Sequence, residues 1–227
     1  MERWEDFYFE GAKQGCLYRR WADHVLTTRI AFGSGPDGYR AESVIRFEPG
    51  TGRWDTSSYR QGPGLTEASA RREDFGLPGT SLPSYGEYLL VADMIGSGTQ
   101  AVEFFRLDDA APAEPDSGAW ARVSLAGTED VLLTDGRRSL CDRFEVVQSA
   151  RMRETVAGLP GRKDYALDAG AELVGVHWSA AGRVVKSDWR GAKSFLAPDR
   201  ATATASLDRT LIDFLDAGYG ARPAPAD

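Results

Sequence analysis

The fold is decided by residues 39–47, which read Tyr-Arg-Ala-Glu-Ser-Val-Ile-Arg-Phe. Every second residue of this run falls on one face, which holds Tyr39, Ala41, Ser43, Ile45 and Phe47. The charged residues all fall on the opposite face. Because successive side chains of a β-strand point to opposite sides, this period of two residues predicts a half-buried strand.

The same pattern extends over much of the chain. Residues 24–32 alternate, with His24, Leu26, Thr28, Ile30 and Phe32 on one face, and residues 53–60 are rich in strand-forming side chains. Several strands of this kind, with one or two short helices, predict a mainly β fold. We expect a single curved antiparallel sheet that forms a barrel or half-barrel, with a β-sandwich as the alternative.

Two β-hairpins are predicted from turn residues. A two-residue Asp135-Gly136 loop would place Val131 opposite Leu140. A turn at Ala181-Gly182 within residues 173–189 would place Trp178 opposite Val185. In that register one face of the second hairpin carries Val174, Val176, Trp178, Val185 and Trp189.

Two helices are predicted among the strands. Ser84 and Glu87 have the spacing of a capping box, and the apolar run that follows to Ile95 ends at Gly-Ser-Gly, although a strand competes there. The second helix covers residues 208–217, with Leu211, Phe214 and Leu215 at helical spacing. We expect this C-terminal helix to pack on the open edge or mouth of the curved sheet.

Length and charge limit the class of protein. The 227 residues fit one domain over residues 1–220, followed by a Pro- and Ala-rich tail, 221–227, that we expect to be disordered. The net charge of −7 disfavours nucleic acid and anionic membranes as partners, whereas a homodimer is left open. With no apolar signal segment at the start, we expect a cytoplasmic protein in which Cys16 and Cys141 are reduced.

Residues 176–189 read Val-His-Trp-Ser-Ala-Ala-Gly-Arg-Val-Val-Lys-Ser-Asp-Trp. This segment resembles the late hairpin of half-barrel proteins of the lipoprotein-carrier type, in which a Trp, a short turn and Gly-Arg precede apolar alternation. The resemblance implies a concave sheet around a hydrophobic ligand, as in lipocalin-like binding, often with a helix at the mouth. Some cytosolic proteins of similar shape are cofactor-free enzymes. The resemblance implies no site residue, because the carriers have no catalytic motif.

No catalytic or cofactor motif is present. The sequence contains no GxSxG elbow, Walker loop, HExxH or GxGxxG that opens a helix. Only two histidines occur, and the two cysteines have no CxxC spacing, so we expect neither a metal site nor a cofactor.

Any catalysis would therefore depend on isolated polar side chains in a pocket. His24 and Asp142 each fall in an alternating apolar row, and we predict that both point into one cavity. Glu103 is a third candidate catalytic residue on a strand with two mixed faces. The alternatives are a strand-end histidine at His24 and a buried ion pair with an arginine at Asp142.

Aromatic residues predict the lining of the pocket. The candidate ligand-binding residues are Tyr39, Trp54, Tyr59, Trp178 and Trp189. An ordinary aromatic core is the alternative interpretation. His177 lies on the face away from Trp178 in the predicted hairpin and is expected to point outward.

These observations favour a cofactor-independent enzyme that acts on a hydrophobic small molecule, by cyclisation, isomerisation or a related rearrangement in bacterial secondary metabolism. The alternative is a non-catalytic binding or carrier protein for such a molecule. An oligomeric structural or interaction protein is a third class. Pocket polarity distinguishes the first two, because an enzyme needs two or more convergent polar groups and a carrier does not.

Overall fold

The computed structural model describes residues 1–35, 37–62, 65–75, 77–111, 118–149 and 171–220. They form one 13-stranded sheet, in which the strands lie in the order β6-β5-β4-β3-β2-β1-β13-β12-β11-β10-β9-β8-β7. The strands are β1 (Glu2–Phe9), β2 (Ala12–Ala22), β3 (Val25–Phe32), β4 (Tyr39–Phe47), β5 (Trp54–Gln61), β6 (Thr66–Arg71), β7 (Ser81–Pro83), β8 (Ala101–Leu107), β9 (Ala119–Leu132), β10 (Arg138–Gln148), β11 (Glu172–Ala180), β12 (Arg183–Trp189) and β13 (Ala192–Leu196).

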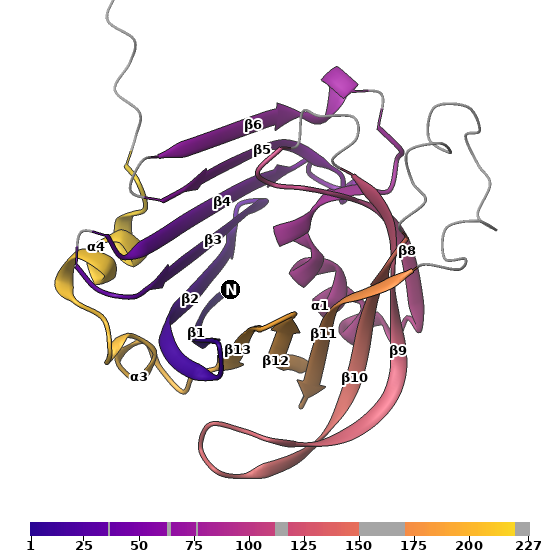
Figure 1. The fold of residues 1–227 in the computed structure, drawn as a ribbon. Coiled ribbons are helices and arrows are strands. Elements are labelled where there is room, and N and C mark those ends of the chain that lie inside the picture. The colour runs from indigo at the N-terminus through magenta and orange to yellow at the C-terminus, as the bar shows by residue number, and fades with distance from the viewer. Residues whose placement is uncertain (36, 63–64, 76, 112–117, 150–170, 221–227) are drawn as a thin grey trace, which may run out of the picture.

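The sheet curls around its own interior without closing. Its neighbouring strands are antiparallel except for β7 and β8, and its two end strands, β6 and β7, are not hydrogen-bonded to each other. Figure 1 shows the curve of the sheet. In its middle, the first strand of the chain, β1, pairs with the last strand, β13. The predicted fold class, a mainly β protein with a single curved antiparallel sheet, is confirmed.

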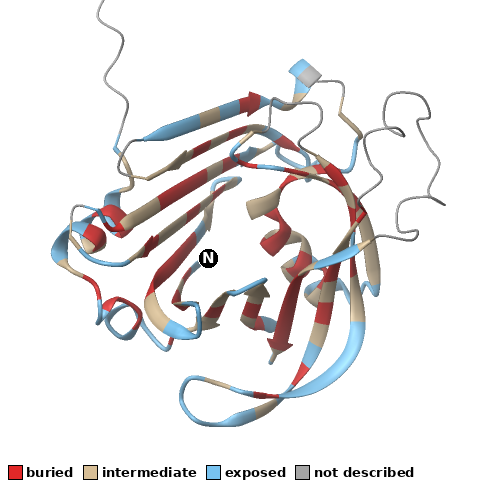
Figure 2. Ribbon diagram, in the orientation of Figure 1, coloured by how far each residue is buried: buried red, intermediate tan, exposed pale blue. Residues whose placement is uncertain are grey.

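Helix α1 (Glu87–Ser97) lies inside the curve. Its buried apolar side chains, Tyr88, Val91 and Met94, pack against strand residues that include Phe144 and Val146. Figure 2 shows buried positions both on this helix and on the strands around it. The helix ends at Gly98, which has a positive φ of 73°. The predicted helix is confirmed, but the predicted capping box is wrong, because Ser84–Gly86 forms a separate 3₁₀ turn, η2, and Glu87 binds elsewhere.

Two helices near the C-terminus cover the outside of the sheet. They are α3 (Arg200–Thr204) and α4 (Arg209–Ala217), and a further 3₁₀ turn, η1, spans Arg72–Phe75. Leu211 and Phe214 of α4 pack with Cys16 and Tyr18 on β2. The alternate β2 residues, Leu17 and Arg19, face the other way, toward α1. The predicted C-terminal helix is therefore confirmed, but its predicted position at the edge or mouth is wrong.

The first predicted hairpin has a different register. Leu133 donates its backbone N–H to the carbonyl of Arg137, so the loop has three residues and ends at Gly136 with φ 79°. Ser139 therefore lies opposite Val131, where Leu140 was predicted. A slip of one residue exchanges the two faces, and Leu140 is 71% exposed.

The second predicted hairpin is right at its turn and wrong beyond it. Ala180 pairs with Arg183 around Ala181-Gly182, as expected. A β-bulge after Trp178 then places Trp178 opposite Lys186 instead of Val185. Trp178 consequently packs in one cluster with Cys141, whereas Trp189 lines the interior cavity on the other face.

Cys16 and Cys141 are both free and buried, in separate clusters. Within the described residues, every helix is too short or too polar to cross a membrane. The predicted tail, residues 221–227, lies outside the described part of the chain.

Candidate functional site

The site is a cavity of about 250 Å³ between α1 and the concave face of the sheet. One part of its lining is apolar and consists of Phe7, Leu17, Ile30, Trp189 and Ala192. The other part is polar and consists of Arg19, Ser84, Tyr85, Glu87, Tyr88, Arg106 and His177. Larger hollows lie along β4–β6, with about 860 Å³, and beside the β9–β10 hairpin, with about 440 Å³. The interior cavity is bordered by the ion pair of Arg19 with Glu5 and by the contacts of Arg106 and His177 with Glu87.

Strand pairing brings the polar residues together. Arg3 on β1 lies directly opposite Arg19 on β2, and His177 on β11 lies directly opposite Ser187 on β12. Ser187 in turn lies opposite Ser194 on β13. Because directly opposite residues point to the same face, these side chains form adjacent positions on the inner surface.

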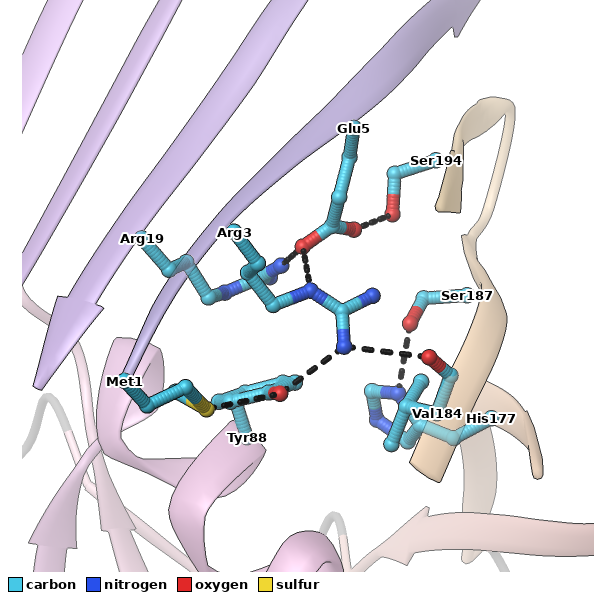
Figure 3. A network of polar contacts seen from close by, with 9 residues as sticks. All are labelled: Met1, Arg3, Glu5, Arg19, Tyr88, His177, Val184, Ser187 and Ser194. Carbon is cyan, nitrogen blue, oxygen red and sulfur yellow. Dashed lines mark hydrogen bonds and ion pairs between the residues drawn. The ribbon is translucent and has the colours of Figure 1, made fainter. Parts of the chain in front are cut away.

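Glu5 is the centre of the first polar group (Figure 3). Its side chain is 1% exposed, and its Oε1 forms ion pairs with Arg3 Nε, at 2.8 Å, and with Arg19 Nη1. Its Oε2 accepts a hydrogen bond from the Ser194 hydroxyl. Burial alone would raise the pKa of the Glu5 carboxyl, but the two guanidiniums and the hydroxyl outweigh it and hold that pKa below its usual range.

Arg3 connects this group to α1. Its Nη1 donates to the Tyr88 hydroxyl at 2.8 Å and to the carbonyl of Val184 at 3.0 Å. The guanidinium of Arg19 lies 4.5 Å from the centre of the Tyr88 ring. Tyr88 is thus held by two arginines, which positions the first turns of α1 against β1 and β2.

Glu87 is the centre of the second polar group. Its Oε1 lies 3.0 Å from His177 Nε2, its Oε2 accepts from Arg106 Nε at 3.1 Å, and His177 Nδ1 lies 2.8 Å from the Ser187 hydroxyl. Burial would raise the pKa of Glu87, but the hydrogen bond with His177 and the charge of Arg106 lower it. Because an ionised carboxylate can only accept hydrogen bonds, His177 donates its Nε2–H to Glu87, and its Nδ1 is hydrogen-bonded to the Ser187 hydroxyl.

Asp109 is a third buried carboxyl, at the seam where the sheet does not close. It accepts hydrogen bonds from Ser43 on β4 at 3.1 Å, from the Ser84 hydroxyl at 2.5 Å and from the Tyr85 backbone N–H at 3.0 Å. Burial raises the pKa of Asp109, because none of these three donors is charged. The carboxyl thus connects β4 to the segment that leads into α1.

The structure contradicts the predicted catalytic residues. His24 is exposed in the tight turn between β2 and β3, with φ 59°, so it precedes the strand whose alternation placed it inside. Asp142 is exposed too, because the face of β10 that it shares with Phe144 is buried only from Phe144 onward, and Leu140 and Asp142 both lie in the exposed part. Glu103 is half-buried opposite Arg122. None of the three lines the cavity.

The predicted aromatic residues are dispersed, and only Trp189 lines this cavity. Tyr39 and Tyr59 have their hydroxyls 3.4 Å apart, and Tyr59 lines the larger hollow along β4–β6. Trp54 is fully buried in the core, where its Nε1 lies 3.3 Å from the Ser81 hydroxyl. Trp178 lies on the other face and donates to Glu129 at 2.9 Å.

Sequence reasoning missed the residues that form the polar part of the site. His177 was expected to point outward, on the face of its strand away from Trp178. It does lie on the face away from Trp178, but that face is the interior one, and His177 is 1% exposed. Arg3, Glu5 and Arg19 look like the solvated face of a strand, and no spacing distinguishes them from one. Glu87 was assigned to a helix cap. Only pairing across five strands reveals the group, so no local signal identifies it.

No cluster of three or more His, Cys, Asp or Glu suited to a metal ion occurs among the described residues. No family model and no curated protein matches the chain. A similar solved structure is that of a β-barrel-like protein of the domain of unknown function DUF1849 from Brucella abortus. Its identity to this chain is 8% and its TM-score is 0.47, over 86% of this chain and 95% of that one.

Proposed function

We propose that this protein binds a small organic molecule in the cavity between α1 and the sheet, without transforming it. The observation that carries the proposal is an interior cavity of about 250 Å³ that joins an apolar lining to a set of buried charged side chains. Ligand sites typically combine such a largely apolar wall with a few fixed polar groups. The volume lies just below the common range of about 300–1,000 Å³, which favours a ligand smaller than a typical drug.

The polar groups at the cavity are suited to fixing the orientation of a ligand. Each one is held by other side chains: Glu5 holds Arg19, and Glu87 holds both Arg106 and His177. Groups fixed in advance lose little conformational freedom when a ligand binds, so more of the interaction energy appears as affinity. The apolar lining, with Phe7, Leu17 and Trp189, would supply the burial that drives binding.

A cofactor-independent enzyme of the cyclase or isomerase type is the second candidate. The observation that favours it is the His177–Glu87 pair at the cavity, because a histidine held by a carboxylate is a common general base. Both ring nitrogens of His177 are already hydrogen-bonded, so a proton transfer would first require the bond to Ser187 or Glu87 to open. This saturation is the reason that we rank binding above catalysis.

Filling the cavity tests the binding function. Ala192 begins β13 and lines the cavity, so Ala192→Leu would occupy part of its volume. Ala201→Leu, at an exposed position of α3, adds the same atoms outside it. Titration calorimetry with 4-phenylbutanoate and 4-phenylbutan-1-ol should show binding to the wild type and to Ala201→Leu, and at least about tenfold weaker binding to Ala192→Leu.

Two results would contradict the binding function. If neither compound binds the wild type, or if Ala192→Leu binds as tightly as the wild type while keeping its melting temperature, the cavity is not the site. Catalysis is checked by recovering the compound that co-purifies with the protein and incubating it with fresh protein. Conversion by the wild type but not by His177→Gln supports the enzyme, and unchanged compound from both contradicts it.

A further inference from the structure

The buried charges around the cavity do not balance. Arg3 and Arg19 both pair with one carboxylate oxygen, Oε1 of Glu5, and Arg106 pairs with Glu87. Three guanidiniums therefore contact two carboxylates. Asp109, the remaining buried carboxyl at this end of α1, is hydrogen-bonded to Ser43, Ser84 and the Tyr85 backbone and forms no ion pair with any arginine of the described chain.

The excess positive charge is buried, and Arg19 presents it at the cavity. The Arg19 side chain is 4% exposed, whereas Arg106 is 25% exposed. A buried cation that lacks a full counter-charge is costly, because it gives up its hydration without equivalent compensation. An anion in the cavity would supply the missing charge.

The hydrogen-bond donors of Arg19 are also incompletely used. Its Nη1 contacts Glu5, but its buried Nε donates to no atom of the described residues. The guanidinium carbon lies 4.5 Å from the centre of the Tyr88 ring and 5.7 Å from the centre of the Trp189 ring, and both residues line the cavity. Stacking of this kind fixes the plane of the guanidinium, and its planar fork matches a carboxylate.

We propose that the cavity recognises an organic acid, whose carboxylate binds at Arg19 and whose apolar body lies against Phe7, Leu17 and Trp189. This inference rests on the proposed binding function and specifies the ligand. A single negative charge matches the single excess guanidinium, whereas a phosphate dianion would reverse the imbalance. A ligand with a cationic head would add to a positive charge that is already uncompensated.

The test compares two ligands that differ only in charge. Titration calorimetry with 4-phenylbutanoate and 4-phenylbutan-1-ol at low salt should show that the wild type binds the acid at least about tenfold more tightly than the alcohol. Arg19→Met keeps the length and apolar stem of the side chain but removes its charge. In this variant the acid should bind no more tightly than the alcohol, whose affinity should stay within about threefold of its wild-type value.

Arg20→Met is the matched control, because Arg20 is the next residue of β2, is exposed and faces the other way. It should keep the wild-type preference for the acid. If Arg19→Met does not fold, Arg19→Lys replaces it and should lower the affinity for the acid more than that for the alcohol, since an ammonium lacks the planar fork.

Equal binding of acid and alcohol by the wild type would overturn the organic-acid inference while leaving the binding function intact. A preference for the acid that survives Arg19→Met, or that Arg20→Met abolishes, would also overturn it. Absence of binding by both compounds would overturn the binding function together with the inference.

Discussion

Replacing Glu5 by Gln tests the buried charge group that supports the site. Glu5 is the only carboxylate that contacts Arg3 and Arg19 within the described chain, and all three side chains are at least nine-tenths buried. Removing one partner of a buried ion pair costs about 3–5 kcal/mol, because the other charge remains buried without compensation. For a chain of this size each kcal/mol lowers the melting temperature by about 2–4 °C, so we expect a decrease of about 10 °C.

Glu2→Gln is the control on the same strand. Glu2 is exposed and accepts one hydrogen bond from Trp4 at 3.1 Å, so this change should alter stability by less than about 0.5 kcal/mol. Urea unfolding followed by tryptophan fluorescence measures both variants. If the free energy of unfolding of Glu5→Gln lies within about 1 kcal/mol of the wild-type value, the ion pairs of Glu5 do not stabilise this part of the fold.

The difference between Glu5→Gln and the wild type should also depend on pH. The folded pKa of Glu5 is lowered, so the stability it contributes is present above the unfolded pKa and is lost as pH falls through the folded pKa. The two proteins should therefore differ most near neutral pH and converge in acid. Combining Glu5→Gln with Arg19→Met removes one uncompensated cation, and the double variant should be more stable than Glu5→Gln alone.

Three further predictions follow from other buried groups. Burial raises the pKa of Asp109, so the stability that this carboxyl contributes is lost as pH rises through its folded pKa. Over that rise, Asp109→Asn should gain stability relative to the wild type. A constant difference between the two free energies of unfolding from pH 4 to pH 8 would contradict this. Leu211→Ala should cost about 2–5 kcal/mol in urea unfolding, whereas exposed Thr210→Ala should cost less than about 0.5 kcal/mol; equal losses would show that α4 does not depend on its apolar face. Burial raises the pKa of Cys16 to about 12, and Cys141 is fully buried, so iodoacetamide at pH 8 should label neither cysteine before unfolding and both after it.

The fold was predictable from sequence because its signals are local. Residues 39–47 form β4 with the predicted bounds, and the apolar stripe of residues 208–217 forms a helix that ends at Gly218. These patterns depend on side-chain direction along one element, which the backbone geometry determines. The position of α4 was not predictable, because its stripe fits either face of a curved sheet.

The site was not predictable because it depends on registers. The three-residue loop at Gly136 and the bulge after Trp178 each shift a strand by one residue, which exchanges its inner and outer faces. The bulge thereby separates Trp189, which lines the cavity, from Trp178 and Val185, which pack in another cluster. His177 was placed outside because the sequence does not show which face of its strand is the interior one. Arg3, Glu5 and Arg19 carried no signal at all, since a charged row on a strand indicates solvent unless its partners are known.

The most direct test of an organic-acid site in the interior cavity is a crystal structure of the protein with 4-(4-bromophenyl)butanoate, in which anomalous scattering locates the bromine. We expect one bromine peak within the cavity beside Phe7, Leu17 and Trp189, and a carboxylate within hydrogen-bond distance of Arg19 Nε. A cavity without ligand, together with bromine in the hollow along β4–β6 or beside the β9–β10 hairpin, would contradict it.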